Sequence, residues 1–325
     1  MNRTYSLIAG TTLLLSSSAL AAPLQLPRDG WARWTVPAVA DAPVWCCYGW
    51  NDSSTTTPSC RLDEKSNGYS RRDHQTTADV RIYARMKAGQ VEHVRALAAN
   101  CPVQTTTPIH DLGAVDASDS ARWLADLLKS STRSGDNARS ERMAALAIHR
   151  DSTAQVALAS LARGGESLEL RKDAVFWLAH LRGVEGAKVA TALMFDDPEP
   201  LMRVHSTFAV TQSKSPQIAT DLIRLANTDR DTHVRAQAWF WLAHTGAPQT
   251  EGAIDAGLRK ESEQEVREQA IFALSRLPDE RGTKALIAVA ENKSLSREDR
   301  KKAIFWLAQN DSDAAIAYLD RVVAR

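Results

Sequence analysis

Residues 234–245 read Val-Arg-Ala-Gln-Ala-Trp-Phe-Trp-Leu-Ala-His-Thr, and the chain repeats this pattern at a nearly fixed interval. The arginine of the segment belongs to a series spaced by 32 residues, with one step of 33: Arg139, Arg171, Arg203, Arg235, Arg267 and Arg300. Five residues after the arginine, every copy except the first carries a phenylalanine: Phe176, Phe208, Phe240, Phe272 and Phe305. A fixed period of about 20 to 50 residues is the sequence signature of stacked structural repeats.

Two further positions of the repeat indicate which side of a helix is buried. The third residue after the arginine is small in five of six copies (Ala174, Ser206, Ala238, Ala270 and Ala303), and the seventh is Leu or Val. These positions lie one helical turn apart and therefore face the same side. A shorter apolar segment and a turn precede each arginine, so each unit is predicted to be a helical hairpin. Residues 116–325 thus predict an α-solenoid of six helical pairs, closed by a last helix at Asp313–Arg325.

Structural roles explain two other features of the repeat. Small or acidic residues lie four positions before the arginine, as at Ser167 and Asp231, where they suit the start of a helix. The arginine itself is predicted to pair with acidic groups on adjacent turns. Such a structural ladder is favoured over a ligand site.

Residues 1–21 have the pattern of a secretory signal peptide. Arg3 supplies the positive end, Ile8–Leu15 lies in a mildly apolar run, and Ala19–Ala21 forms a small-x-small cleavage site. The mature chain is therefore predicted to begin at Ala22 and to be periplasmic or secreted. An uncleaved anchor is the alternative. Beyond this segment no hydrophobic run approaches the roughly 20 residues that span a bilayer, and the chain is not expected to be membrane-spanning.

The charge balance argues against one class of partner. The chain holds 40 Lys and Arg against 39 Asp and Glu. Nothing in this balance indicates a nucleic acid or an anionic membrane as partner.

Residues 22–115 differ in composition and predict a small β-rich domain. Ala32–Val36 and Val80–Met86 read as extended segments, and Val91–Leu97 follows as the second strand of a hairpin. Asn51–Ser59 reads as a polar loop. The fold class expected for the whole chain is therefore mainly α, with the solenoid preceded by this domain.

All four cysteines lie in this N-terminal domain: Cys46, Cys47, Cys60 and Cys101. An exported chain favours disulfides. Because a ring between adjacent cysteines is strained, we expect one of Cys46 and Cys47 to pair with Cys60 and the other with Cys101. A metal or redox site is the alternative, but the Cys-x-x-Cys spacing that zinc sites favour is missing from the sequence.

Tryptophans and polar residues recur at positions away from the predicted core. The sixth position after the arginine holds Trp177, Trp241 and Trp306, and the ninth holds His180, Gln212, His244, Arg276 and Gln309. With His205 of the third repeat, these residues are predicted to line a partner-binding groove, because aromatic anchors with polar neighbours form interface hot spots. The alternative is that the tryptophans fill gaps between helices. His180 and His244 lie two repeats apart, about 20 Å, so no shared metal ion is expected.

The pattern resembles HEAT repeats, in particular the short bacterial HEAT-like repeats also found in phycobilisome lyases. The resemblance rests on Asp231-x-x-Val234-Arg235-x-x-Ala238-x-Phe240-x-Leu242-Ala243 and on its counterparts after Arg267 and Arg300. It covers roughly residues 116–325 and is specific for fold and weak for function. Met202–Gln212 departs from the pattern through His205, Ser206 and the threonines, which suggests a bend or a polar contact point.

The resemblance implies a scaffold that binds a protein. Deoxyhypusine hydroxylases of the HEAT type hold iron through His-Glu pairs, and this sequence contains no His-Glu dipeptide. The sequence contains no Gly-x-Ser-x-Gly, His-Glu-x-x-His, P-loop or Gly-x-Gly-x-x-Gly motif. We therefore expect a non-catalytic protein without cofactors that binds a partner protein in the periplasm or cell envelope. The alternatives are an enzyme or cofactor-linked accessory protein, oxidoreductase- or lyase-like, with its site in the N-terminal domain, and a cell-wall or glycan binder that uses the tryptophans.

Overall fold

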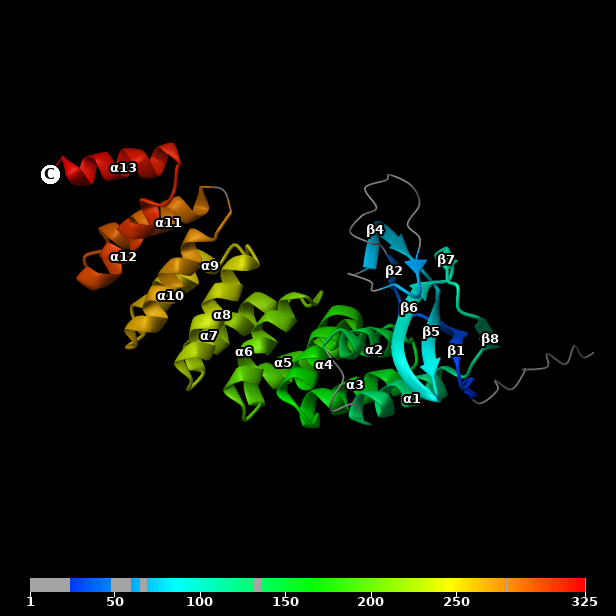
Figure 1. Ribbon diagram of the computed structural model, residues 1–325. Coiled ribbons are helices and arrows are strands. Elements are labelled where there is room, and N and C mark those ends of the chain that lie inside the picture. Colours follow the sequence, from blue (N-terminus) through cyan, green and yellow to red (C-terminus); the bar gives the residue numbers. More distant parts are fainter. Residues whose placement is uncertain (1–23, 48–59, 65–68, 131–135, 279, 325) are drawn as a thin grey trace, which may run out of the picture.

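The computed structural model describes residues 24–47, 60–64, 69–130, 136–278 and 280–324 (Figure 1). The predicted signal peptide and the predicted Asn51–Ser59 loop lie outside these residues. The described part begins with a sheet region, and the helices follow in a curved row that ends at α13. No helix within the described residues has both the length and the apolar character needed to cross a membrane.

The largest sheet has four strands in the order β6-β5-β1-β8. β1 (Gly30–Pro37) runs antiparallel to β5 (Asp79–Lys87) and parallel to β8 (Ile109–Ala114). β5 and β6 (Gln90–Ala98) form the predicted hairpin, joined at Ala88 and Gly89, which both have positive φ. Positive φ at both turn residues matches the natural twist of paired strands.

Two small strand pairs complete the sheet region. β2 (Pro43–Cys47) pairs with β4 (Tyr69–Thr76), and β3 (Cys60–Arg61) pairs with β7 (Val103–Gln104). A disulfide joins Cys46 to Cys101, one of the bonds that the expected pairing allows. Cys60 is also disulfide-bonded, whereas the side chain of Cys47 lies outside the described residues.

The helical part has six pairs and a terminal helix among the described residues, as the repeat predicted. The first helices of the pairs are α1 (Ala117–Ser130), α3 (Ser152–Gly164), α5 (Gly183–Asp196), α7 (Ile218–Thr228), α9 (Thr250–Leu258) and α11 (Arg281–Glu291). The second helices are α2 (Asp136–Ile148), α4 (Leu168–Leu181), α6 (Pro200–Thr211), α8 (Thr232–His244), α10 (Gln264–Ser275) and α12 (Arg297–Leu307). α13 spans Asp313–Val323.

The residues four positions before the arginines start the second helices, as predicted. Ser167, Glu199, Asp231 and Ser296 are N-caps whose side chains accept backbone N–H groups of the first turn. Each such bond satisfies a donor that has no partner within the helix, and its loss costs about 1 kcal/mol. Glu263 is an N-cap without such a bond.

The repeated arginines form the predicted ladder. Arg203 reaches Asp229 through two bonds of 2.8 and 2.9 Å, and its third nitrogen donates to the carbonyl of Asp197 at 2.9 Å. Arg171 binds the side chain of Asp197, so this one aspartate is held from both sides by successive arginines. The same arrangement recurs at Arg235 with Glu261. Arg171, Arg203 and Arg235 thus each tie their own repeat to the next, as do Arg139 through Asp173 and Arg267 through Asp299. Arg300 instead donates to the carbonyl of Leu295 in its own repeat.

The apolar core continues from the sheet into the helices. Trp34 of β1 is fully buried, contacts Trp123 edge-on at 5.5 Å and donates its indole N–H to Ser120 Oγ at 2.8 Å. Ser120 also lies 2.8 Å from His149 Nε2, and the other ring nitrogen of His149 lies 2.6 Å from the carbonyl of Ala145. The chain therefore changes from strand to helix between β8 and α1, but the apolar core continues across this boundary.

Candidate partner-binding surface

The second helices bring the recurrent aromatic residues into one row, which we call the aromatic ladder. Its members are Phe176, Trp177, Phe208, Phe240, Trp241, Phe272, Phe305 and Trp306. The row forms because residues 32 positions apart occupy equivalent places on adjacent, parallel-stacked helices. It runs from α4 through α6, α8 and α10 to α12.

The rings of the ladder contact one another from repeat to repeat. Phe176 stacks on Phe208 with centroids 5.8 Å apart and planes 12° apart, and Phe240 stacks on Phe272 at 6.0 Å and 12°. Trp241 connects these two stacked pairs, because it packs against Phe208 with the ring centroids 4.9 Å apart. Aromatic pairs of this kind add about 0.5–1.5 kcal/mol beyond their burial. The ladder therefore contributes to stability as well as to the surface.

The ladder is not part of the buried core. All its members except Phe305 are half-buried, and Phe305 is 52% exposed. The core-facing partners on the same helices, such as Leu242 and Leu274, are buried. A continuous row of partly exposed rings forms an apolar strip, and contiguous apolar patches mark interaction sites more often than single exposed apolar residues do.

The histidines predicted for the groove contact this ladder. His180 stacks on Phe176 at 5.5 Å and 13°, and His244 packs against Phe240 at 4.3 Å. His205 packs edge-on against Phe208, and its Nε2 lies 3.1 Å from the carbonyl of Lys172. Burial lowers the pKa of His205, and the neighbouring charge of Lys172 lowers it further. His205 is therefore neutral near neutral pH.

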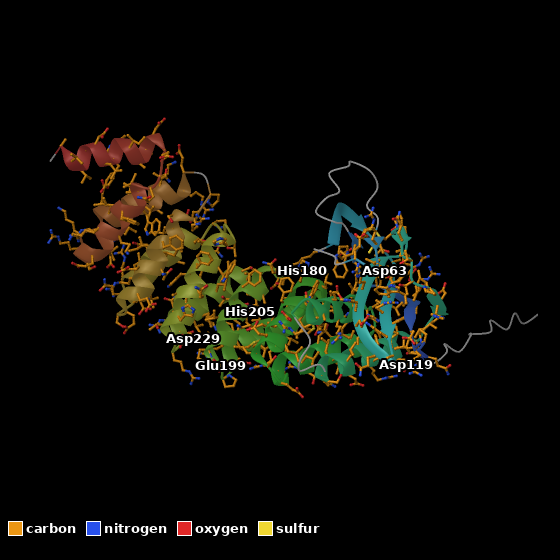
Figure 2. The ribbon with its side chains drawn as sticks, viewed as in Figure 1. Asp63, Asp119, His180, Glu199, His205 and Asp229 are labelled. Carbon is orange, nitrogen blue, oxygen red and sulfur yellow. A yellow bond between two sulfur atoms is a disulfide. The ribbon has the colours of Figure 1, made fainter. Side chains whose placement is uncertain are left out.

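The other predicted residues are distributed along the surface. Gln212 caps the end of α6 and donates to Thr211 Oγ1 at 3.1 Å. Arg276 follows α10 as its C-cap and is exposed, and Gln309 is exposed beyond α12. Figure 2 places His180 nearer the sheet region than His205. The predicted residues thus follow the row of helices instead of gathering around one point.

Two features of the ladder were not assigned from sequence. Trp45 of β2, which is buried, packs edge-on against Trp177 at 5.6 Å, so the row adjoins the core of the sheet region at this end. No sequence pattern links residues 45 and 177. The phenylalanines at the fifth position were visible in the period, but their shared face with the tryptophans follows only from how the helices stack.

Two groupings that could carry chemistry can be judged from the described residues. Among the described residues, no group of three or more His, Cys, Asp and Glu side chains is placed to hold a metal ion. The Ser120–His149 pair resembles a nucleophile and its base, but both residues are fully buried, so a substrate cannot reach them. Burial lowers the pKa of His149 to about 4.

Comparisons with known proteins place this architecture. A family model described as HEAT repeats matches residues 186–275. Among solved structures, the chain is similar to human deoxyhypusine hydroxylase in complex with glycerol, with 14% identity, a TM-score of 0.30, and coverage of 63% of this chain and 90% of that one. This likeness carries no argument about activity. No curated protein matches the chain. The chain therefore carries HEAT repeats, matched at residues 186–275, behind an N-terminal sheet region.

Proposed function

We propose that this protein is an exported, non-catalytic HEAT-repeat scaffold that binds a partner protein in the periplasm or cell envelope through the aromatic ladder. The observation that carries the proposal is the continuous row of partly exposed rings on α4, α6, α8, α10 and α12. Rings held by their neighbours lose little conformational entropy when a partner covers them, and pre-organisation of this kind favours affinity.

The packing of the rings favours a protein partner over a glycan. Sugar rings bind by lying on an open aromatic face, whereas the stacked pairs Phe176–Phe208 and Phe240–Phe272 cover each other's faces. Their edges remain for apolar side chains of a partner. Export is supported by the signal pattern in residues 1–21.

Site-specific photo-crosslinking in the producing cells tests the binding surface. A photoreactive residue at His244 or Arg276, both exposed beside the ladder, is expected to yield a discrete protein adduct. The matched control places the same residue at Thr220 of α7 or Lys284 of α11, which are exposed on the first helices of their pairs. Equal adducts from both sets, or none from the ladder positions, would contradict the proposal.

Two further measurements address export and the chemical class of the partner. Cell fractionation and the mass of the purified chain are expected to show an exported protein beginning at Ala22. Adducts that resist proteases and yield to glycan hydrolases would favour the glycan alternative. The test of export is independent of whether the ladder binds.

A further inference from the structure

The row of rings leads into a cleft at the junction of the sheet region and the helices. The cleft has a volume of about 580 Å³, in the range of ligand sites. It is lined by residues of the segment Val39–Pro43, of the first turns of α3 and α5, and of the ends of α4 and α6. His180 belongs to both features, because it lines the cleft and stacks on Phe176 of the ladder.

Three cationic side chains line the cleft: Arg150, Arg182 and Lys214. Two carboxylates line it as well. Asp41 pairs with Lys214 at 3.5 Å, and Glu185 pairs at 2.7 Å with Lys188, which lies outside the cleft. These pairs leave Arg150 and Arg182 as the charges that no lining carboxylate neutralises.

Both guanidinium groups are held by neutral acceptors. Arg182 donates to Gln155 Oε1 at 2.9 Å and to backbone carbonyls that include Asp151 at 3.1 Å. Arg150 donates to the carbonyls of Ala38 at 2.9 Å and Ala78 at 3.4 Å. Neither has an ion pair within the described residues. Asp151 attracts Arg182 electrostatically, but its side chain accepts from the N–H of Thr153 at the start of α3.

We propose that this cleft receives a carboxylate of the partner, at the end of an apolar segment that lies along the aromatic ladder. The inference rests on the proposed function and adds the chemical class of the partner. Cations fixed in place by backbone carbonyls need little reorganisation to accept a carboxylate, and guanidinium groups bind carboxylates with directional hydrogen bonds. The apolar strip and the positive cleft together require a partner segment with apolar residues and an acidic end.

Two synthetic peptides serve as probes for the purified full chain. One alternates leucine and serine and ends in two aspartates, and the other has the same length, two asparagines in their place and an amidated end. We expect fluorescence anisotropy to show the acidic peptide binding about tenfold tighter, because one well-placed ion pair changes affinity by about that factor. This preference is expected to fade as salt rises.

A gain of affinity is the decisive result, since damage to the fold cannot produce it. Asp41→Asn removes a negative charge from the cleft and suits the backbone, because Asp41 has φ of +58° and Asn tolerates that region. We expect it to tighten acidic-peptide binding about threefold. Asp126→Asn is the matched control, an exposed aspartate that also pairs with a lysine at 3.5 Å. Lys214→Glu is expected to weaken acidic-peptide binding about tenfold.

The outcomes separate this inference from the proposed function. Equal affinities for the two peptides, or the same effect from Asp41→Asn and Asp126→Asn, would overturn the carboxylate site. If Trp241→Ala then weakens both peptides equally, the ladder still binds and only the cleft proposal fails. If Trp241→Ala changes neither while the acidic preference persists, the ladder is not the binding surface. Failure of both peptides to bind overturns the inference.

Discussion

Removing one charge from the arginine ladder gives the sharpest test of how the repeats hold together. Asp229→Asn leaves a similar shape and an oxygen for the N–H of Asp231, which now bonds Asp229 Oδ1 at 2.8 Å. It removes the negative charge that faces Arg203 through bonds of 2.8 and 2.9 Å. The two side chains are only 3% and 5% exposed, so water cannot replace the lost charge.

The expected loss follows from this burial. Breaking a buried pair by removing one partner costs about 3 kcal/mol or more, because the remaining charge loses its direct partner. Arg203 would keep only the weaker attraction of Asp231 and Asp197. Arg259→Ala is the control. Arg259 binds Asp255 at 2.7 Å, but the two side chains are 52% and 45% exposed, and such pairs contribute about 0.5 kcal/mol. The double variant Arg203→Met, Asp229→Asn should be destabilised by less than the sum of its single changes, because no unpaired charge remains.

Urea unfolding followed by far-ultraviolet circular dichroism measures these differences. Hydrogen exchange locates them, and faster exchange is expected in α7 and α8, the helices that the pair joins to α6. A loss for Asp229→Asn of about 1 kcal/mol or less, similar to that of the exposed control, would show that the ladder is not a buried electrostatic tie. Strictly additive single and double variants would refute the reasoning as well.

Three other predictions concern stability. The folded pKa of His149, about 4, lies below its ordinary 6.5, so the unfolded chain takes up the proton first as pH falls. Stability should drop by about 3 kcal/mol between these pH values, and His149→Gln should flatten that drop in urea titrations across the range. Replacing Cys46 and Cys101 by Ala opens a loop of 55 residues, which should cost about 4 kcal/mol in the chain-entropy model and lower the melting temperature. A Cβ on Gly257 would meet Trp239 at 2.5 Å, whereas one on Gly252 of the same helix meets nothing within 4 Å; Gly257→Ala should therefore destabilise by about 1–3 kcal/mol and Gly252→Ala stabilise by about 0.5 kcal/mol in calorimetry.

The helical part was predictable because its information is local and repeated. The period sets each arginine, each cap and each core position, and six copies reinforce one another. The repeat predicted that Arg203 pairs with an acidic residue. The sequence does not say which acidic residue each arginine takes, so the choice of Asp229 was not predictable. That choice depends on how far adjacent hairpins rotate, which no single repeat encodes.

The sheet region and its contacts were less accessible to prediction. The hairpin of β5 and β6 was visible in alternating residues and a turn. The parallel pairing of β1 with β8 and the contact of Trp45 with Trp177 join residues far apart in the chain. Contacts between residues far apart in the chain produce no repeating pattern in the sequence. The cleft lined by Arg150 and Arg182 was missed for the same reason.

The sheet packs on the first helical pair through Trp34, Ser120 and His149. It therefore covers the face of that pair that a preceding repeat would otherwise cover. A repeat array has two ends, and each end exposes a face that an inner unit would cover. Here the β-strands close one end, and α2 also donates from Arg142 to the carbonyl of Val91 in β6 at 3.2 Å. Cleavage of the chain after residue 115 would expose the apolar face of the first helical pair to water. Such a fragment is expected to aggregate or to unfold from that end inward.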